Sequence, residues 1–285
     1  MAGLIDLARF FAHHPLTKDA QFDAWGRFAS WQIKSRLHEE VLMPWIAGQR
    51  LAVRRGMTGA TGNLYAGVHE FADMMLLLHF IREGDLFLDI GANVGSYTVL
   101  ASGVRKATTW AFEPDPDTAR KLARNIELND LRARVTVHEL ALGNADGETR
   151  FTVGLDCTNK VADEAETSFR LVRQQRLDTL IGDAQPSMIK MDVEGHEEAV
   201  LLGAVAVLAR PSLKVIELET VTPTMSRLLA EQQFERAWYE PFSRALRRDA
   251  PKGGSANNTV FVRDWAFVAA RLRDAQSIQV LGHSV

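Results

Sequence analysis

The chain of 285 residues is long enough for one large domain or two small ones, and its 46% hydrophobic and 24% charged residues are typical of a globular protein with a sizeable core. Its net charge of −3 argues against the broad positive field of a nucleic-acid-binding protein, and a single cysteine, Cys157, excludes a disulfide framework and a cysteine-based zinc site. The N-terminus has no signal-peptide pattern, and no apolar run reaches the ~20 residues that span a bilayer. We therefore expect a soluble, cytoplasmic protein.

The first part of the chain, residues 1–58, predicts a helical N-terminal extension. Trp25, Phe28 and Trp31 recur at three-residue steps, which places them on one face of a helix. We expect this face to pack onto the main domain, and a homo-oligomer formed through these helices remains an open alternative. Residues 59–67 are rich in Gly and Asn and predict a turn region.

From residue 59 to 263, short apolar segments alternate with helical ones, which indicates a doubly wound, mostly parallel sheet. Residues 149–153 and 169–174 interrupt this alternation and predict an inserted β-hairpin around a polar loop at 155–168. The last segment, 264–285, predicts a helix followed by a frayed tail. The other predicted strands are 86–90, 108–113, 134–142, 187–192, 213–219, 237–244 and 259–263. The longer predicted helices are 70–82, 96–102, 118–129, 197–209 and 224–234.

The segment from Asp89 to Gly95 reads Asp-Ile-Gly-Ala-Asn-Val-Gly and lies between a predicted strand and a predicted helix. At this edge of an open α/β sheet, glycines let backbone N–H groups approach a ligand, and the helix N-terminus favours negative charge. A dinucleotide fingerprint would need further glycines where the chain has Asn93 and Ser96, and the Gly-Lys-Ser/Thr of a P-loop is absent. The motif therefore indicates a ligand-binding turn of another class.

An acidic residue, Glu113, ends the predicted strand 108–113 and follows Gly91 by 22 residues. A carboxylate about 20 residues after such a turn accepts hydrogen bonds from the ribose hydroxyls of a nucleotide. Its negative charge also disfavours a 2′-phosphate. The turn and Glu113 together predict a ligand that contains adenosine.

Five segments resemble the FkbM family of S-adenosylmethionine-dependent methyltransferases. They are DIGANVG at 89–95, EPDP at 113–116, ALG at 141–143, MIKMDVEGHE at 188–197 and NNTVFV at 257–262. The similarity covers about residues 80–263, and IKMDVEGHE is its most specific part. It implies an α/β fold of the class I methyltransferase type, which is a Rossmann-like, seven-stranded, mostly parallel sheet with helices on both faces. Here that domain would carry the helical extension and the inserted hairpin.

The resemblance also implies how S-adenosylmethionine binds and what is methylated. Glu113 would hold the ribose, Pro114 and Asp115 would border the adenine, and Asp192 would lie next to the transferred methyl. The family methylates oxygen on sugars and related natural products, which implies a hydroxyl acceptor on a saccharide, a glycoconjugate or a related precursor and a role in polysaccharide biosynthesis. The cofactor-binding residues implied are Asp89, Gly91, Asn93, Gly95, Glu113, Pro114, Asp115, Glu139, Leu140, Ala141 and Asp192.

Methylation of a hydroxyl also requires a group that removes its proton. His196 is a candidate, because a histidine with a pKa of about 6.5 is suited to act as a base near neutral pH. Asp192 or Glu194 can serve as the base instead or can orient the histidine. The three residues are therefore the predicted catalytic group.

The family implies no bound metal, but a metal-assisted alternative stays open. Asp192, Glu217 and Glu219 lie at or near the ends of strands that are neighbours in this fold. Hard oxygen ligands in such positions hold Mg²⁺ and acidify a substrate hydroxyl.

Two other functions also stay open. One is an N-methyltransferase that acts on a small molecule or a protein, although such enzymes for nucleobases or Gln often carry an Asn-Pro-Pro-Tyr-like motif where this chain has Asp-Val-Glu-Gly at 192–195. The other is a cofactor-binding interaction module without catalysis, which has no need for an intact turn together with Glu113 and Asp192. The expected partner is a small-molecule or glycan acceptor, and no nucleic acid is expected.

Overall fold

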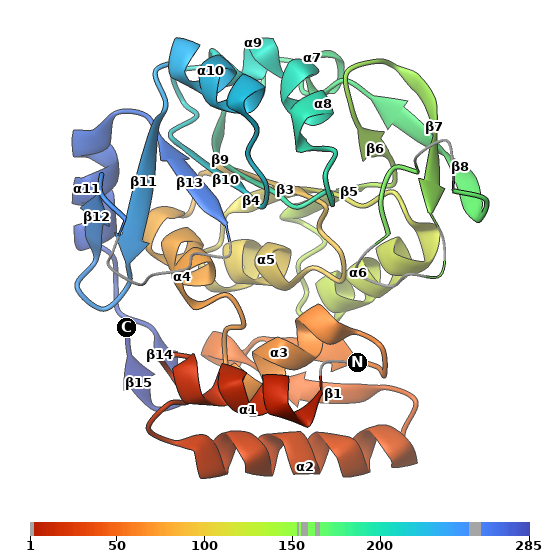
Figure 1. The fold of residues 1–285 in the computed structure, drawn as a ribbon, viewed down its shortest axis with the longest axis vertical. Coiled ribbons are helices and arrows are strands. Elements are labelled where there is room, and N and C mark those ends of the chain that lie inside the picture. Colours follow the sequence, from red (N-terminus) through yellow and green to blue (C-terminus); the bar gives the residue numbers. More distant parts are fainter. Residues whose placement is uncertain (1–2, 153, 155–158, 163–165, 251–257) are drawn as a thin grey trace.

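The structure is a computed structural model that describes residues 3–152, 154, 159–162, 166–250 and 258–285. Cys157 and part of the predicted loop at 155–168 lie outside the described residues. Figure 1 shows a central sheet with helices on both faces, and the N-terminal elements form a further layer below one of the helical layers. No described helix has the length and apolar character needed to cross a membrane.

The central sheet is the predicted doubly wound, mostly parallel sheet, with one strand more than expected. Its strands are β3 (Leu86–Ile90), β4 (Thr108–Phe112), β5 (Val135–His138), β9 (Pro186–Met191), β10 (Val215–Leu218), β11 (Glu235–Glu240), β12 (Ala245–Arg247) and β13 (Thr259–Val262). They lie in the order β12-β11-β13-β10-β9-β3-β4-β5. The strands from β10 to β5 are parallel, and β13, β11 and β12 complete the sheet with antiparallel pairings. The short strand β12 is the eighth.

Helices cover both faces of the sheet, which is why its central strands are nearly continuous apolar runs. One face carries α4 (Phe71–Phe80), α5 (Ser96–Val99), the π-helical turn η2 (Leu100–Val104) and α6 (Pro116–Leu128). The other carries α7 (Leu177–Leu180), α8 (Glu197–Leu202), α9 (Val205–Leu208) and α10 (Pro223–Glu231). Every residue from Met74 to Phe80 of α4 is buried, as expected for a helix that is packed on all sides.

The predicted helix 197–209 is wrong as a single helix, because the chain is interrupted between α8 and α9. The carboxylate of Asp178 accepts hydrogen bonds from the backbone N–H groups of Ala206 (3.1 Å) and Val207 (3.0 Å). A side-chain acceptor at this place satisfies the free N–H groups of a new helix start. A second helix therefore begins here.

The N-terminal layer is less helical than predicted. It contains α1 (Leu4–His13), α2 (Gln21–Leu37), β1 (Val41–Pro44), the 3₁₀ turn η1 (Ile46–Gly48), β2 (Arg50–Val53) and α3 (Thr58–Ala66). The strands β1 and β2 form an antiparallel pair, and α3 replaces the turn predicted at 59–67. Packing against α2 explains why α3 forms. Arg27 donates a hydrogen bond to the carbonyl of Tyr65 (2.8 Å), and the ring centres of Phe28 and Tyr65 lie 5.6 Å apart. Tertiary contacts here override weak helix propensity.

The C-terminal segment is ordered, so the predicted frayed tail is wrong. After α11 (Trp265–Arg273), the strands β14 (Gln279–Val280) and β15 (His283–Ser284) pair as a hairpin. Ile278 and Val285 exchange two backbone hydrogen bonds, of 2.8 and 3.0 Å. Val280 and Val285 are buried in the same apolar cluster as the residues of α4, and this burial holds the hairpin in place.

The inserted hairpin is confirmed and forms part of a small second sheet. Its strands are β6 (Ala141–Leu142), β7 (Gly147–Thr152) and β8 (Phe169–Gln175), in the order β6-β8-β7. β7 and β8 are antiparallel. The single strand predicted at 134–142 is divided into β5 and β6, and the second part joins the small sheet.

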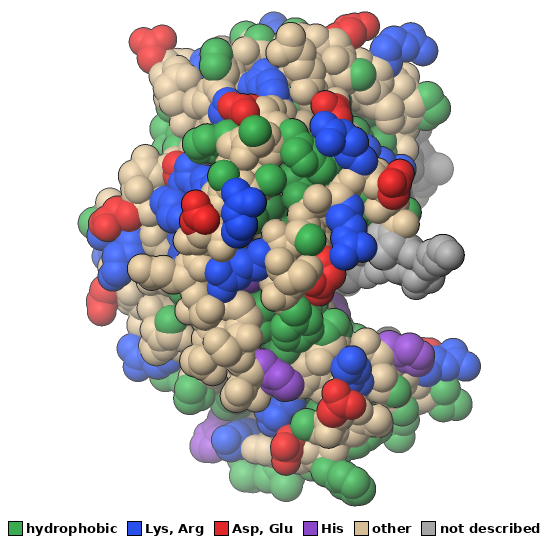
Figure 2. Space-filling view, turned by 90° about the vertical axis from the view of Figure 1, so that its left-hand side faces the viewer, with side chains coloured by type: hydrophobic (Ala, Val, Ile, Leu, Met, Phe, Trp, Pro, Cys, Tyr) green, Lys and Arg blue, Asp and Glu red, His purple; other side chains and the backbone are tan. Residues whose placement is uncertain are grey.

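Arginine side chains connect β12 with β11 and with the end of α11. This side of the molecule faces the viewer in Figure 2. Arg248 pairs with Glu235 (2.9 Å), and Arg244 donates hydrogen bonds to the carbonyl of Arg273 (3.2 Å) and the hydroxyl of Ser277 (2.8 Å). Figure 2 shows the basic side chains interspersed with acidic and apolar ones.

The turn after β3 generates a prediction about stability. Gly91 has a φ of +78°, and a Cβ at this position would lie 1.9 Å from the carbonyl oxygen of Asp192. Gly84 has a similar φ of +89°, but a Cβ there would meet no atom within 4 Å. We expect Gly84→Ala to lower the free energy of unfolding by about 1–2 kcal/mol through backbone strain alone, and Gly91→Ala by clearly more because it adds a clash with backbone.

Urea denaturation of both variants and the unaltered protein checks this expectation. Equal losses of stability in the two variants would mean that the contact between Gly91 and Asp192 is not as close as the structure describes.

Candidate active site

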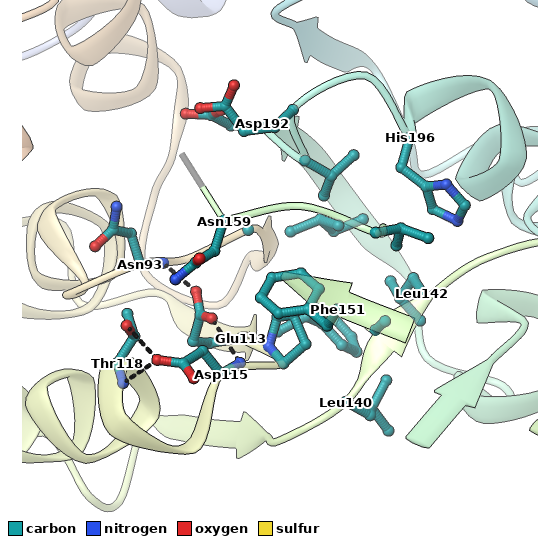
Figure 3. A pocket seen from close by; sticks show the side chains of 18 residues that line it. Asn93, Glu113, Asp115, Thr118, Leu140, Leu142, Phe151, Asn159, Asp192 and His196 are labelled. Carbon is teal, nitrogen blue, oxygen red and sulfur yellow. Dashed lines mark hydrogen bonds between the residues drawn. The ribbon is translucent and has the colours of Figure 1, made fainter. Parts of the chain in front are cut away.

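A pocket lies at the carboxyl ends of β3, β4 and β9 and is closed on one side by the small sheet (Figure 3). Ligands of open α/β sheets bind at this edge. Ten of the predicted site residues line it: Gly91, Asn93, Glu113, Pro114, Asp115, Leu140, Ala141, Asp192, Glu194 and His196.

Three of the predicted cofactor-binding residues lie outside this lining. Asp89 is buried below the turn, where its carboxylate accepts a hydrogen bond from the Thr98 hydroxyl (2.5 Å). Gly95 precedes α5 and faces the side chain of Leu122, and Glu139 is exposed in the bend between β5 and β6. These residues shape the strand ends without facing the pocket.

Glu113 links the two loops that form the floor of the pocket. Its carboxylate accepts hydrogen bonds from the backbone N–H of Asn93 (3.0 Å) and of Asp115 (2.9 Å). Burial raises the pKa of Glu113 to about 7, although these two hydrogen bonds oppose the shift. Each carboxylate oxygen has a second lone pair, so Glu113 can still accept a hydrogen bond from a ligand.

Asp115 begins α6 and fixes the same floor. Its carboxylate accepts hydrogen bonds from the backbone N–H (3.0 Å) and the hydroxyl (2.9 Å) of Thr118, which makes it an N-cap. Its other oxygen lies 3.3 Å from the guanidinium of Arg170, on β8. The small sheet is thereby tied to the mouth of the pocket.

One wall of the pocket is apolar and comes from Pro114, Leu140, Leu142 and Phe151. Phe151, on β7, is a pocket residue that is not among those predicted from the sequence. Its only sequence signal is its position in the predicted hairpin, and nothing in that pattern indicates that the hairpin folds over the strand ends. Such a wall suits a flat aromatic group.

Asp192 directly follows β9 and forms an ion pair with Lys190 of the same strand, with 3.0 Å between the ammonium nitrogen and the carboxylate. Burial alone would raise the pKa of Asp192, but the charge and hydrogen bond of Lys190 and a hydrogen bond from Glu219 hold it below its ordinary value. Asp192 is therefore an ionised carboxylate at the edge of the pocket.

The structure groups Asp192 with Glu194 and Glu219, whose carboxylate atoms lie within 4.8 Å of one another. Burial, reinforced by Asp192 and Glu194, raises the pKa of Glu219 to about 7. The predicted alternative set differs, because Glu217 lies deeper in the sheet and accepts hydrogen bonds from Tyr97 (3.2 Å) and Asn258 (3.3 Å). Asp192, Glu217 and Glu219 are thus not brought together as one group.

His196 lies apart from the other two catalytic candidates. Figure 3 shows its ring and the carboxylate of Asp192 apart and pointing away from each other. Burial lowers the pKa of His196, which Glu197 opposes, and its Nε2 atom is buried without a hydrogen-bond partner among the described residues. The geometry therefore groups Asp192 with Glu194 and leaves His196 separate.

Comparison with known proteins gives a family match over the segment that forms this pocket. Residues 89–239 match the methyltransferase FkbM domain. The hexuronic acid methyltransferase AglP of Haloferax volcanii is 32% identical over 163 residues, which are 55% of this chain and 66% of that protein. The match thus spans slightly less than two thirds of the relative's length.

Two solved structures show distant likeness. A methyltransferase FkbM from Methylobacillus flagellatus aligns with a TM-score of 0.42 and 20% identity, over 62% of this chain and 43% of that one. An S-adenosylmethionine-dependent O-methyltransferase from Thermotoga maritima aligns with a TM-score of 0.37 and 13% identity, over 69% of this chain and 65% of that one. Likeness this distant carries no information about function. On the family match, which covers more than half of the sequence, the chain belongs to the FkbM methyltransferase domain family.

Proposed function

We propose that the protein transfers a methyl group from S-adenosylmethionine to a hydroxyl oxygen of a saccharide or a related glycoconjugate precursor. The observation that carries the proposal is the pocket itself, in which a buried carboxyl group, Glu113, and an ionised carboxylate, Asp192, follow β4 and β9, the two strands that flank β3 in the sheet. The first suits a ribose and the second suits a hydroxyl that must lose its proton.

The residues of the pocket fit S-adenosylmethionine. A Cβ at Gly91 would collide with the backbone of Asp192, so only glycine fits at this point of the turn. Gly91 lines the pocket, where its backbone can approach a ligand closely. Glu113 would accept hydrogen bonds from the ribose hydroxyls, and Pro114 and Leu140 would contact the adenine. When bound, the cofactor supplies a methyl group attached to a positively charged sulfur.

Asp192 has the position and charge to receive the acceptor's proton. Methyl transfer is an in-line displacement, so the protein mainly orients the acceptor and takes up a proton from its hydroxyl. The ion pair with Lys190 (3.0 Å) keeps the Asp192 carboxylate ionised at neutral pH. We therefore assign the proton-accepting role to Asp192 rather than to His196.

The charges beside Asp192 favour a neutral acceptor. AglP is named for a hexuronic acid, which supports a sugar as the substrate class. Here, however, Glu194 and Glu219 crowd the carboxylate of Asp192 within 4.8 Å. The ionised carboxylate of Asp192 and the acidic Glu194 would repel a carboxylate on the acceptor, while Glu219, which donates a hydrogen bond to Asp192, would add little charge.

A panel of acceptors tests the proposed function directly. We expect methyl transfer to the hydroxyl groups of neutral saccharides with a kcat/KM at least about tenfold higher than for matched hexuronic acids, because like-charge contacts cost more than 1 kcal/mol. Mass spectrometry of the products locates the new methyl group. Transfer to nitrogen, or faster reaction of the hexuronic acids, would contradict the assignment.

The raised pKa of Glu113 predicts that cofactor binding depends on pH. A ligand that donates hydrogen bonds favours the ionised carboxylate, which is depleted as the pH falls below about 7. We expect the affinity for S-adenosylmethionine to fall by up to about tenfold per pH unit below that value, since binding is then linked to release of a proton.

Calorimetric titration of the unaltered protein and of Glu113→Gln at several pH values measures this dependence. The variant should bind about 1.5–3 kcal/mol more weakly at high pH, through loss of charged hydrogen bonds, and should lose the pH dependence. Identical affinities would show that Glu113 does not hold the ribose.

We also propose that the reaction needs no divalent metal ion. Lys190 already neutralises Asp192, so the carboxylate does not need a cation to stay ionised. Treatment with EDTA should leave the rate of methyl transfer unchanged, with EDTA presaturated with Mg²⁺ as the control. Loss of activity that Mg²⁺ restores would instead favour metal assistance by the acidic residues beside Asp192.

A further inference from the structure

A row of charged residues crosses the centre of the otherwise apolar sheet. Lys190 of β9 pairs in register with Asp89 of β3 on one side and with Glu217 of β10 on the other. Paired positions on neighbouring strands direct their side chains to the same face. All three residues are buried, so the sheet holds two carboxyl groups and one ammonium group side by side at its core.

A buried charge is costly, and this one is compensated from several elements. Burial alone would lower the pKa of Lys190, but the carboxyl groups around it raise the pKa instead, so the ammonium group stays protonated. Its nitrogen also lies 4.6 Å from the centre of the Tyr97 ring. The groups that face Lys190 are Asp192 of the same strand, Asp89 of β3, Glu217 of β10, Glu70 and Asp73 at the start of α4, and Tyr97 of α5.

These surrounding groups hold one another in fixed places. The hydroxyl of Tyr97 donates a hydrogen bond to Glu70 (2.7 Å) and lies 3.2 Å from Glu217, and the amide of Asn258 donates to Asp73 (3.0 Å) and Glu217 (3.3 Å). The ammonium nitrogen of Lys190 makes its one hydrogen bond among the described residues to Asp192 (3.0 Å). The buried network therefore supports a cation whose direct contact is the proposed proton acceptor.

Apart from Lys160, whose charge acts on Glu194, the other charged groups near Asp192 are acidic. Glu194 and Glu219 approach it within 4.8 Å, Glu197 of α8 acts on both of these, and Asp89 lies below. Within the described part of the chain, Lys190 is the partner of Asp192 in an ion pair. Without that partner, the hydrogen bond from Glu219 would still favour the ionised form, but burial and the charges of Glu194 and Asp89 would favour protonation and reorientation of the Asp192 carboxyl group.

We propose that Lys190 is a positioning residue for methyl transfer, which holds the Asp192 carboxylate ionised and in one orientation at the pocket, while Asp89 and Glu217 fix Lys190 from the two neighbouring strands. This inference rests on the proposed role of Asp192 as the proton acceptor. Lys190 itself would touch neither the cofactor nor the acceptor, and it would act through Asp192 alone.

A double-mutant cycle tests the proposal. We expect Lys190→Met to lower kcat at least about tenfold while the affinity for S-adenosylmethionine changes little, because a charge-assisted hydrogen bond is lost. In the Asp192→Asn background, Lys190→Met should lower kcat no further, since its effect passes through Asp192. The acidic limb of the kcat–pH profile should also move to higher pH in Lys190→Met, because loss of the cation raises the pKa of Asp192.

Two further variants control for folding and for the loss of a lysine. Lys190→Met combined with Glu217→Gln removes a buried acid together with its cation, and it should retain the cofactor affinity and the low kcat. Lys214→Met removes another lysine that forms an ion pair with an aspartate, Asp264 (3.0 Å). Lys214 directly precedes β10, at the edge of the sheet opposite the pocket, so kcat should stay unchanged.

The outcomes separate this inference from the proposed function. An equal fall in kcat in both backgrounds, or an unshifted pH profile, would overturn the role of Lys190 while leaving Asp192 as the proton acceptor. Wild-type kcat in Asp192→Asn would remove the proposed role of Asp192, and the inference about Lys190 would fall with it. Absence of methyl transfer by the unaltered protein to any acceptor would contradict the proposed function itself.

Discussion

The site depends on the close contact between Gly91, in the turn after β3, and the backbone of Asp192. The N–H of Asp192 donates to the carbonyl of Ile90 (2.9 Å), and the N–H groups of Gly91 and Ala92 share the carbonyl of Phe112 (3.0 and 2.9 Å). These bonds join the ends of β3, β4 and β9 at one point. The position leaves no room for a Cβ at residue 91, so the geometry of the pocket follows from a single glycine.

Around this point the protein accepts a cost that a purely structural sheet would avoid. Lys190 and Glu217 occupy central strand positions where apolar side chains would pack with less penalty, and one oxygen of Glu217 is buried without a partner among the described residues. Buried polar residues that lower stability are common at functional sites. Lys190 and Glu217 lie directly behind the sheet edge where the pocket opens.

The features set by local sequence were the ones that the sequence predicted well. Apolar runs with the Gly-containing turn between them indicate the central strands. The spacing of Glu113 from Gly91 and its place at a strand end put it at the pocket, as the structure does, and its contact with a ribose stays a prediction. The elements that depend on distant contacts are not predicted: α3 is stabilised by α2, the C-terminal hairpin by α4, and Phe151 reaches the pocket only through the fold of the small sheet. The position of Glu217 apart from Glu219 depends on side-chain packing in the sheet, and residues two apart on one strand look equivalent in sequence.

The role of the pocket in this proposal is to bind S-adenosylmethionine. Its most direct test is calorimetric titration of the unaltered protein with S-adenosylmethionine and S-adenosylhomocysteine, beside NAD and ATP. We expect saturable binding of the first two compounds and none of the others, because the pocket has a carboxylate placed for a ribose and an apolar wall but neither of the glycine motifs that bind pyrophosphate or triphosphate. Binding of NAD or ATP in preference to both methionine-derived compounds would contradict it.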